Sequence, residues 1–258
     1  MTIRQSTALR NYVLLGGSFR DAFQGGKLKI YSGAQPASAN DAPTGTIGVT
    51  ITDAAGAHTA EVRSLGSVDL TGGASGSVDT ITVNSIEIMG SSTPFNTSLA
   101  QTAADVADKI NRNTKNKLFK AFVTATDVIN IEAKPGLGTL PNAWVVASTV
   151  TTITKTDANM AGGVAAVNGL NFNNAAAGSM ARRTGQTWSG VVANTITAGW
   201  FRLEAPMADS GALDSTESQL RLDGSVATSG GDLNLTSTSL TATATETITT
   251  FTPTEPAS

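Results

Sequence analysis

Two segments of small residues divide this sequence and most constrain how it can fold. The first is GGASGS at residues 72–77, and the second is AGGVAA at residues 161–166. Such runs are typical of flexible linkers and turns, since they neither form a regular element nor supply large side chains to a core. The sequence between them has a pattern of its own. We therefore predict an inserted domain at residues 72–163.

The inserted segment has the pattern of a small α+β domain. Residues 79–89 alternate apolar and polar side chains, as a strand pair does. Ser98 followed by Gln101 is a capping box that predicts the start of a helix. The apolar stripe of that helix is formed by Leu99, Ala103, Val106 and Ile110. A hairpin at 119–133 and a last long strand at 143–154 complete a predicted ββαβββ unit.

The sequence outside the insert is predicted to be all-β after its first residues. GKLKIYSGAQP at 26–36 and TIGVTIT at 46–52 read as half-buried strands between turns. Residues 1–70 hold too few strands for a sandwich, so they must pair with strands that follow the insert. The predicted fold class is therefore mainly β, with a discontinuous β-sandwich-like outer domain (1–70 plus 167–258) and the inserted domain at 72–163.

Other strands of the outer domain are predicted with weaker signals. One is expected before the insert, at 64–70. Those expected after the insert are 188–192, 198–203, 218–222, 233–235 and 243–251. The polar segment 32–45, with two prolines and few apolar residues, is predicted to be a surface loop.

Two short helices are predicted at residues 6–24. Ser6 and Ser18 can cap their N-termini, while Gly16 and Gly25 suit the left-handed conformation that ends a helix. Neither helix is long enough to be stable alone in water, so both must pack on the sheet or on a neighbouring subunit.

The composition offers little for catalysis. There are no cysteines, which excludes disulfides and thiolate chemistry, and charged residues make up only 14 %. The net charge of −3 argues against nucleic-acid binding, and no apolar run approaches the ~20 residues of a membrane span. We see no signal peptide. We expect no enzyme activity, no cofactor, no metal and no small-molecule substrate.

The remaining candidates for chemistry are few. The only histidine, His58, is expected to be an exposed loop residue. The acidic side chains of the C-terminal third could bind Ca²⁺, but their spacing matches no calcium loop, and a solvated acidic face is the better interpretation. They are Asp209, Asp214, Glu217, Asp223 and Asp232.

The charge distribution suggests a contact between subunits. Residues 1–30 are basic, whereas residues 199–258 carry eight acidic side chains against two arginines. These charges either scatter over one surface or form complementary faces between neighbouring subunits. Some side chains of the segment Thr2–Phe23 are also more apolar than surface turns require. The possible interface residues are Arg4, Arg10, Leu14, Leu15, Phe19, Arg20 and Phe23.

Several motifs resemble a family of small virion proteins of tailed bacteriophages. They are STALRNYVLLGGSF and GKLKIYSGAQPASANDAPTGT at the front, ITVNSIEIMG and TAADVADKIN in the middle, and AGWFRLEAP, LRLDGSVATSGGDLNLTSTSL and TITTF at the end. The resemblance implies a non-enzymatic structural protein, assembled in the host cytoplasm into the virion. It implies head decoration or a neck or collar position, with copies of itself and other virion proteins (capsid, portal or tail) as partners.

A second hypothesis is a tail-associated module that binds cell-surface carbohydrate during host adsorption. Its natural components are aromatic faces for sugar and carboxylates for orientation or cleavage. They would be Trp144, Trp188 and Trp200 with Asp209 or Asp214. Each tryptophan lies within an apolar strand pattern, however, so packing in the core is the competing interpretation.

Overall fold

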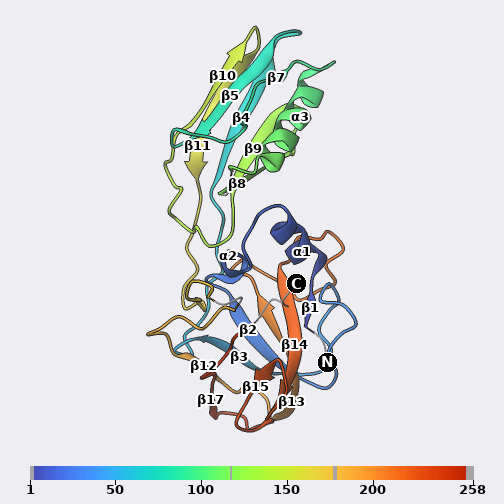
Figure 1. The fold of residues 1–258 in the computed structure, drawn as a ribbon, viewed down its shortest axis with the longest axis vertical. Helices are drawn as coiled ribbons and strands as arrows, with labels where there is room; N and C mark the ends of the chain where they lie inside the picture. The colour runs from blue at the N-terminus through green and yellow to red at the C-terminus, as the bar shows by residue number, and fades with distance from the viewer. Residues whose placement is uncertain (1–2, 117, 177–178, 254–258) are drawn as a thin grey trace. The chain divides into compact units, whose positions relative to one another are not determined.

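The computed structural model describes residues 3–116, 118–176 and 179–253 (Figure 1). About 40 % of the chain is strand and 11 % is helix, and nearly all strand pairs are antiparallel. The predicted fold class, mainly β, is confirmed. Contacts divide the chain into two compact units, Met1–Glu61 with Ala166–Ser258 (the outer unit) and Val62–Ala165 (the inner unit).

The outer unit holds a nine-stranded sheet. The order along its main path is β1-β14-β13-β2-β3-β12-β17, while β15 pairs with β14 and β16 pairs with β13. The strands are β1 (Arg4–Gln5), β2 (Lys27–Ser32), β3 (Ile47–Asp53), β12 (Trp188–Val191), β13 (Ile196–Glu204), β14 (Arg221–Ala227), β15 (Leu233–Asn234), β16 (Ser239–Leu240) and β17 (Thr245–Thr247). Strands before the insert therefore pair with strands after it, as β2 does with β13.

The core of the outer unit lies on one face of this sheet. Alternate residues of neighbouring strands point to the same face, and these are fully buried and apolar. The central members are Leu28, Ile30, Phe201, Leu203 and Leu222. Helices α1 (Thr7–Leu14) and α2 (Phe19–Phe23) add Leu9 and Phe23 to the same cluster.

The predicted helix signals of the outer unit are confirmed. Ser6 and Ser18 cap the two helices by accepting hydrogen bonds from the backbone N–H groups of Leu9 and Asp21. Gly16 and Gly25 both adopt positive φ, where a glycine is not strained.

The inner unit contains two four-stranded sheets and one helix. One sheet runs β10-β5-β6 with β7 beside β5, and the other runs β11-β4-β9-β8. Helix α3 (Leu99–Arg112) packs against β8 and β9 (Figure 1). The strands are β4 (Leu65–Gly72), β5 (Ser77–Val83), β6 (Ile86–Glu87), β7 (Thr93–Pro94), β8 (Phe119–Val123), β9 (Val128–Ala133), β10 (Val146–Thr151) and β11 (Thr154–Ala161).

Two predictions about the inner unit are wrong. The strand expected at 64–70 belongs to this unit rather than to the outer domain, because β4 lies between β9 and β11 and buries Val68 and Leu70 in the inner core. The last long strand expected at 143–154 is interrupted. Its chain turns at Thr152, which has a φ of 58°, and continues as β11 in the other sheet.

Asparagine side chains close one free sheet edge of the inner unit. Asn111 donates to the carbonyl of Ala121 (2.8 Å) and accepts from its N–H (2.9 Å). Asn116 makes the same pair of bonds with Phe119, at 2.9 and 3.1 Å. Each amide thus takes the place of a neighbouring strand, so these outward backbone groups of β8 are not open to another chain.

The place of β4 makes the boundary of the inner unit testable. We expect a fragment of residues 62–165 to unfold cooperatively with β-rich circular dichroism. A fragment of residues 77–161 lacks β4, which leaves β9 without one neighbour and removes Val68 and Leu70 from the core. We expect this shorter fragment to give no cooperative transition. Equal stability of the two fragments would contradict the assignment of β4.

Candidate functional site

Charged side chains cover the face of the outer sheet that is opposite the apolar core. Antiparallel register places Lys27, Glu204 and Arg221 in one row across β2, β13 and β14. Directly opposed residues project to the same face of a sheet. We call this side of the sheet the charged face. Along each strand its residues alternate with the buried apolar residues of the opposite side.

A second row lies beside the first. It consists of Lys29, Arg202 and Asp223, with Arg4 of β1 opposite Asp223. Four residues of the charged face are completely buried, with 0 % exposure: Arg202, Glu204, Arg221 and Asp223. Because an isolated charge in a protein interior is very unfavourable, each of them must be paired.

Arg202 and Asp223 form a bidentate ion pair. The Arg202 Nε and Nη2 atoms donate to the two carboxylate oxygens at 2.8 and 2.7 Å. The remaining Nη1 donates to the carbonyl of Asp41 at 3.0 Å, and the guanidinium lies 5.5 Å from the ring centre of Trp200. Trp200 in turn stacks on Tyr31 at 4.4 Å. Such planar, forked geometry is what arginine offers and lysine lacks.

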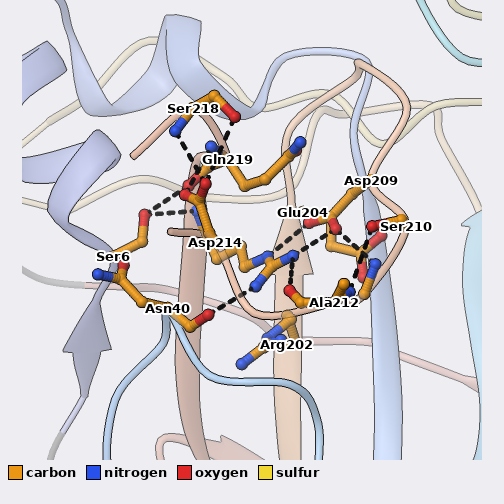
Figure 2. Close-up of polar contacts among 12 residues, drawn as sticks. Ser6, Asn40, Arg202, Glu204, Asp209, Ser210, Ala212, Asp214, Ser218 and Gln219 are labelled. Carbon is orange, nitrogen blue, oxygen red and sulfur yellow. Dashed lines mark hydrogen bonds and ion pairs between the residues drawn. The ribbon is translucent and has the colours of Figure 1, made fainter. Parts of the chain in front are cut away.

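Arg221 and Asp209 form a second bidentate pair; Asp209 and its surroundings are drawn in Figure 2. Arg221 Nε and Nη2 each lie 2.6 Å from a carboxylate oxygen of Asp209. The guanidinium also donates to the carbonyls of Asn40 (3.2 Å) and Ala212 (2.9 Å). Arg221 therefore holds residues of two different loops at once.

Glu204 is buried between two lysines of the neighbouring strand. Its carboxylate oxygens lie 3.3 Å from Lys27 Nζ and 2.6 Å from Lys29 Nζ. Both lysine side chains keep some exposure, so their ammonium groups neutralise Glu204 without being fully desolvated themselves.

Two loops cover the charged face. They are the first cover loop (33–46), between β2 and β3, and the second cover loop (205–220), between β13 and β14. Asp214 organises the second loop by accepting from the backbone N–H groups of Ser218 (3.0 Å) and Gln219 (2.8 Å). Its own N–H donates to the Asn40 carbonyl of the first loop at 2.8 Å.

Ser6 connects helix α1 to the same assembly. Its hydroxyl donates to the carbonyl of Gln219 at 2.7 Å, and both residues are labelled in Figure 2. The same hydroxyl accepts from the N–H groups of Leu9 (3.2 Å) and Arg221 (3.1 Å). One buried hydroxyl thus caps the helix and also binds the start of β14.

The carboxylates of the two ion pairs titrate differently. Burial alone would raise the pKa of Asp209, but the hydrogen bonds from Arg221 and the Gly211 N–H, with the arginine charge, bring that pKa below its usual value. Burial dominates at Asp223 and raises its pKa despite the bonds from Arg202. Burial likewise raises the pKa of Tyr31.

The predicted solvated acidic face is wrong. Asp209, Asp214 and Asp223 are bound inside the charged face or its cover loops. Asp232 accepts from the N–H and hydroxyl of Ser225, and of the five only Glu217 is exposed. The spacing of these residues could not reveal this, because their partners come from other strands.

His58 is not the exposed loop residue that was expected. It is partly buried, and its Nε2 lies 3.0 Å from the carbonyl of Gly25. Burial lowers the pKa of His58, so the neutral ring that donates through Nε2 is favoured near neutral pH. The segment 56–60 is therefore attached to the start of β2.

Some of the predicted interface residues are bound within the outer unit itself, and the others are exposed. Phe23 is fully buried in the outer unit's own core, and Phe19 packs against it edge to face at 5.1 Å. Arg4 donates to the carbonyl of Pro36, and Arg20 donates to that of Phe172 at 3.3 Å. The residues that remain exposed are Arg10, Leu14 and Leu15, whereas Thr2 lies outside the described residues.

Two of the three tryptophans cannot contact a ligand. Trp188 and Trp200 have 0 % exposure, and Asp209 and Asp214, the carboxylates considered with them, are engaged internally. Trp144 is partly exposed and packs edge to face against Phe119 at 6.2 Å. These residues therefore do not assemble a carbohydrate site.

Sequence reasoning missed the central residues of the charged face. FRLE at 201–204 and RLDG at 221–224 alternate apolar and charged residues. That pattern normally indicates one core face and one solvated face. Nothing in it shows that loops bury the second face.

Among the described residues, no group of three or more His, Asp or Glu side chains is arranged to hold a metal ion. No helix in the described part of the chain is long and apolar enough to cross a membrane. In comparisons with protein-family models, curated proteins and solved structures, none matches this chain.

Removing one partner of the Arg202–Asp223 pair should strongly destabilise the outer unit. Arg202→Met leaves Asp223 buried and unpaired, so we expect a loss of about 3–5 kcal/mol in the free energy of unfolding. Urea unfolding followed by tryptophan fluorescence measures it. The control is Arg112→Ala, which breaks an exposed ion pair on α3 and should cost less than about 1 kcal/mol. A similar loss in both variants would contradict the assigned role.

Asp209 should make stability depend on pH. Because its folded-state pKa lies below its unfolded value, its contribution is complete above the unfolded pKa of about 3.9 and disappears as pH falls through the folded pKa. Asp209→Asn removes the charge. We therefore expect the difference in free energy of unfolding between this variant and the wild type to become smaller below about pH 4. Urea midpoints at several pH values test this, with Asp108→Asn, at an exposed position of α3, as control. A gap independent of pH would contradict it.

Proposed function

We propose that this protein is a non-enzymatic structural component of a tailed bacteriophage particle, an accessory virion protein of the head surface or the neck and collar. It would bind copies of itself and other virion proteins. The resemblance of its motifs to small phage virion proteins suggests this role.

The observation that carries the proposal is that the buried charged side chains bind the backbone of the cover loops. Arg202, Arg221 and Asp214 each bind backbone groups of the cover loops, and their polar groups serve to fix the chain in one conformation. Buried ion pairs often add little net stability over apolar replacements, and we infer that here they serve to specify one conformation of the cover loops. A rigidly fixed surface suits a subunit that must repeat the same contacts many times.

Some of the segments that carry the resemblance coincide with this framework, whereas ITVNSIEIMG and TAADVADKIN lie in the inner unit. The motif at 6–19 begins with Ser6 and forms α1, and the motif at 26–46 comprises β2 and the first cover loop. The motif at 198–206 contains Arg202 and Glu204. Part of the likeness therefore falls on residues that build and cover the charged face, which is consistent with a structural role.

The carbohydrate-binding alternative has less support. Its aromatic components are reduced to Trp144, because the other two tryptophans are fully buried in the outer unit. We therefore do not propose it as a second function.

The proposal predicts a fixed place in a particle. We expect the protein in purified virions at a copy number that is a multiple of the symmetry of its location, and we expect particle reconstruction to show it on the head surface or at the neck. Mass spectrometry of gradient-purified particles, with a non-virion phage protein as the contamination control, is the first measurement. Absence of the protein from purified virions would refute the proposal.

A further inference from the structure

Strand β17 lies at one end of the nine-stranded sheet and leaves its outer edge unpaired (Figure 1). The Ile248 N–H, at the end of this strand, donates to the Trp188 carbonyl of β12 at 2.8 Å. Because backbone groups alternate in direction along a strand, those of Thr245 and Thr247 point away from β12. Both threonines are exposed, and β12 is the only strand that pairs with β17 in the described part of the chain.

One end of each inner sheet is closed by side chains instead. Asparagine side chains bind the outward backbone groups of β8. On β10, the N–H groups of Val146 and Ser148 donate to the side chains of Asn159 (3.1 Å) and Asp157 (2.9 Å). Such devices prevent an exposed edge from pairing with another chain. No side chain of the described residues binds the outward backbone groups of β17, so this edge is open to a further strand.

Glu246 lies at the centre of the open edge. Its side chain takes the same face as Ile248, which is buried in the core, and it lies opposite Gly190 of β12. It is partly buried and forms no ion pair within the described residues. Strand β12 carries no ionisable side chain, and Asp53, the only one on β3, accepts a hydrogen bond from Gln186 at 3.1 Å. Burial raises the pKa of Glu246 above its ordinary value.

We propose that β17 pairs antiparallel with β17 of a second copy, and that the negative charge of Glu246 opposes this pairing. A two-fold axis normal to the sheet and next to Glu246 places Thr245 opposite Thr247 of the partner subunit. Residues opposed in this way exchange both of their backbone hydrogen bonds, so the outward donors and acceptors of one edge match those of the other. The contact is isologous and uses up the open edge of both copies, so it closes at a dimer.

The same axis brings the two Glu246 side chains together. Directly opposed side chains of an antiparallel pair are about 5 Å apart, where like charges are unfavourable. In the dimer the pKa of Glu246 rises further, because the second carboxylate and the added burial both disfavour the ionised form. The dimer therefore binds more protons than two monomers, and pairing strengthens as pH falls through the pKa of Glu246. An inward-pointing charge is one of the devices that protect an edge strand.

The inference deepens the proposed function by naming a second copy as the partner of β17, and it rests on that function only for its setting in a particle. The edge is three residues long, so the association should be weak and concentration-dependent.

Sedimentation velocity of the full chain, at concentrations up to about 0.5 mM because a small interface binds weakly, tests the pairing. We expect wild type to dimerise more tightly at about pH 5 than at about pH 8. At the higher pH, Glu246→Gln should bind about fivefold more tightly than wild type, and its dissociation constant should not change with pH. Glu217→Gln, at an exposed glutamate of the second cover loop, is the control and should behave as wild type.

Proline variants locate the contact. Thr247→Pro removes an N–H group that points away from β12, so it should abolish dimerisation. Thermal unfolding should stay close to wild type, because proline is tolerated on an edge strand. Thr245→Pro makes the same test at the other outward position if Thr247→Pro fails to fold.

A mixture of charge variants decides the register. Glu246→Lys alone should dimerise no better than wild type at about pH 8, whereas an equal mixture of the two should associate more tightly than either, because opposite charges then meet at the axis. Glu246→Gln that stays monomeric at every concentration would overturn the proposal. So would dimers that persist in a folded proline variant, or a mixture that associates no better than its parts. Presence in virions is measured separately, so the two proposals can fail independently.

Discussion

The outer unit depends on pairing every charge that its sheet buries. An antiparallel sheet in a small domain usually packs one face on a core and leaves the other to water. Here the second face is covered as well, although it carries Arg202, Glu204, Arg221 and Asp223. Covering these groups is tolerable only because each has a partner within ion-pair distance.

The cover loops follow from this requirement. The bidentate pairs use two donors of each guanidinium, and further donors bind the carbonyls of Asp41, Asn40 and Ala212. Loop backbone that would otherwise be solvated is thereby fixed by arginine. Since removal of one arginine would leave both a buried carboxylate and unsatisfied loop carbonyls, its effects should extend from the sheet to the loops.

The inner unit is stabilised by an apolar core and by side-chain hydrogen bonds at one sheet edge. Its core is a cluster of apolar side chains from the stripe of α3 and from strands of both sheets. Strand β8 has no neighbouring strand on one side in the described part of the chain. There Asn111 and Asn116 form the hydrogen bonds that a neighbouring strand would otherwise make. Polar side chains thus stabilise both units, through buried ion pairs in one and through amides at a sheet edge in the other.

Most local elements and the class of fold could be predicted from the sequence alone. Alternation predicted β2 and β3, the caps at Ser6, Ser18 and Ser98 are formed, and the stripe of α3 faces the inner core. These features depend on neighbours within a few residues, so their signals are complete in a short stretch of sequence.

The roles of the charged residues depend on contacts between distant parts of the chain and could not be predicted from the sequence. Arg202 meets Asp223 across 21 positions, and Glu204 meets Lys29 across a far longer separation, because the register of β2, β13 and β14 aligns them. The same holds for β4. Its own sequence gives only a weak strand signal, and its place in the sheet is set by pairing with β9 and β11. Local patterns specify which face a side chain takes, whereas strand order and loop placement decide whether that face meets water.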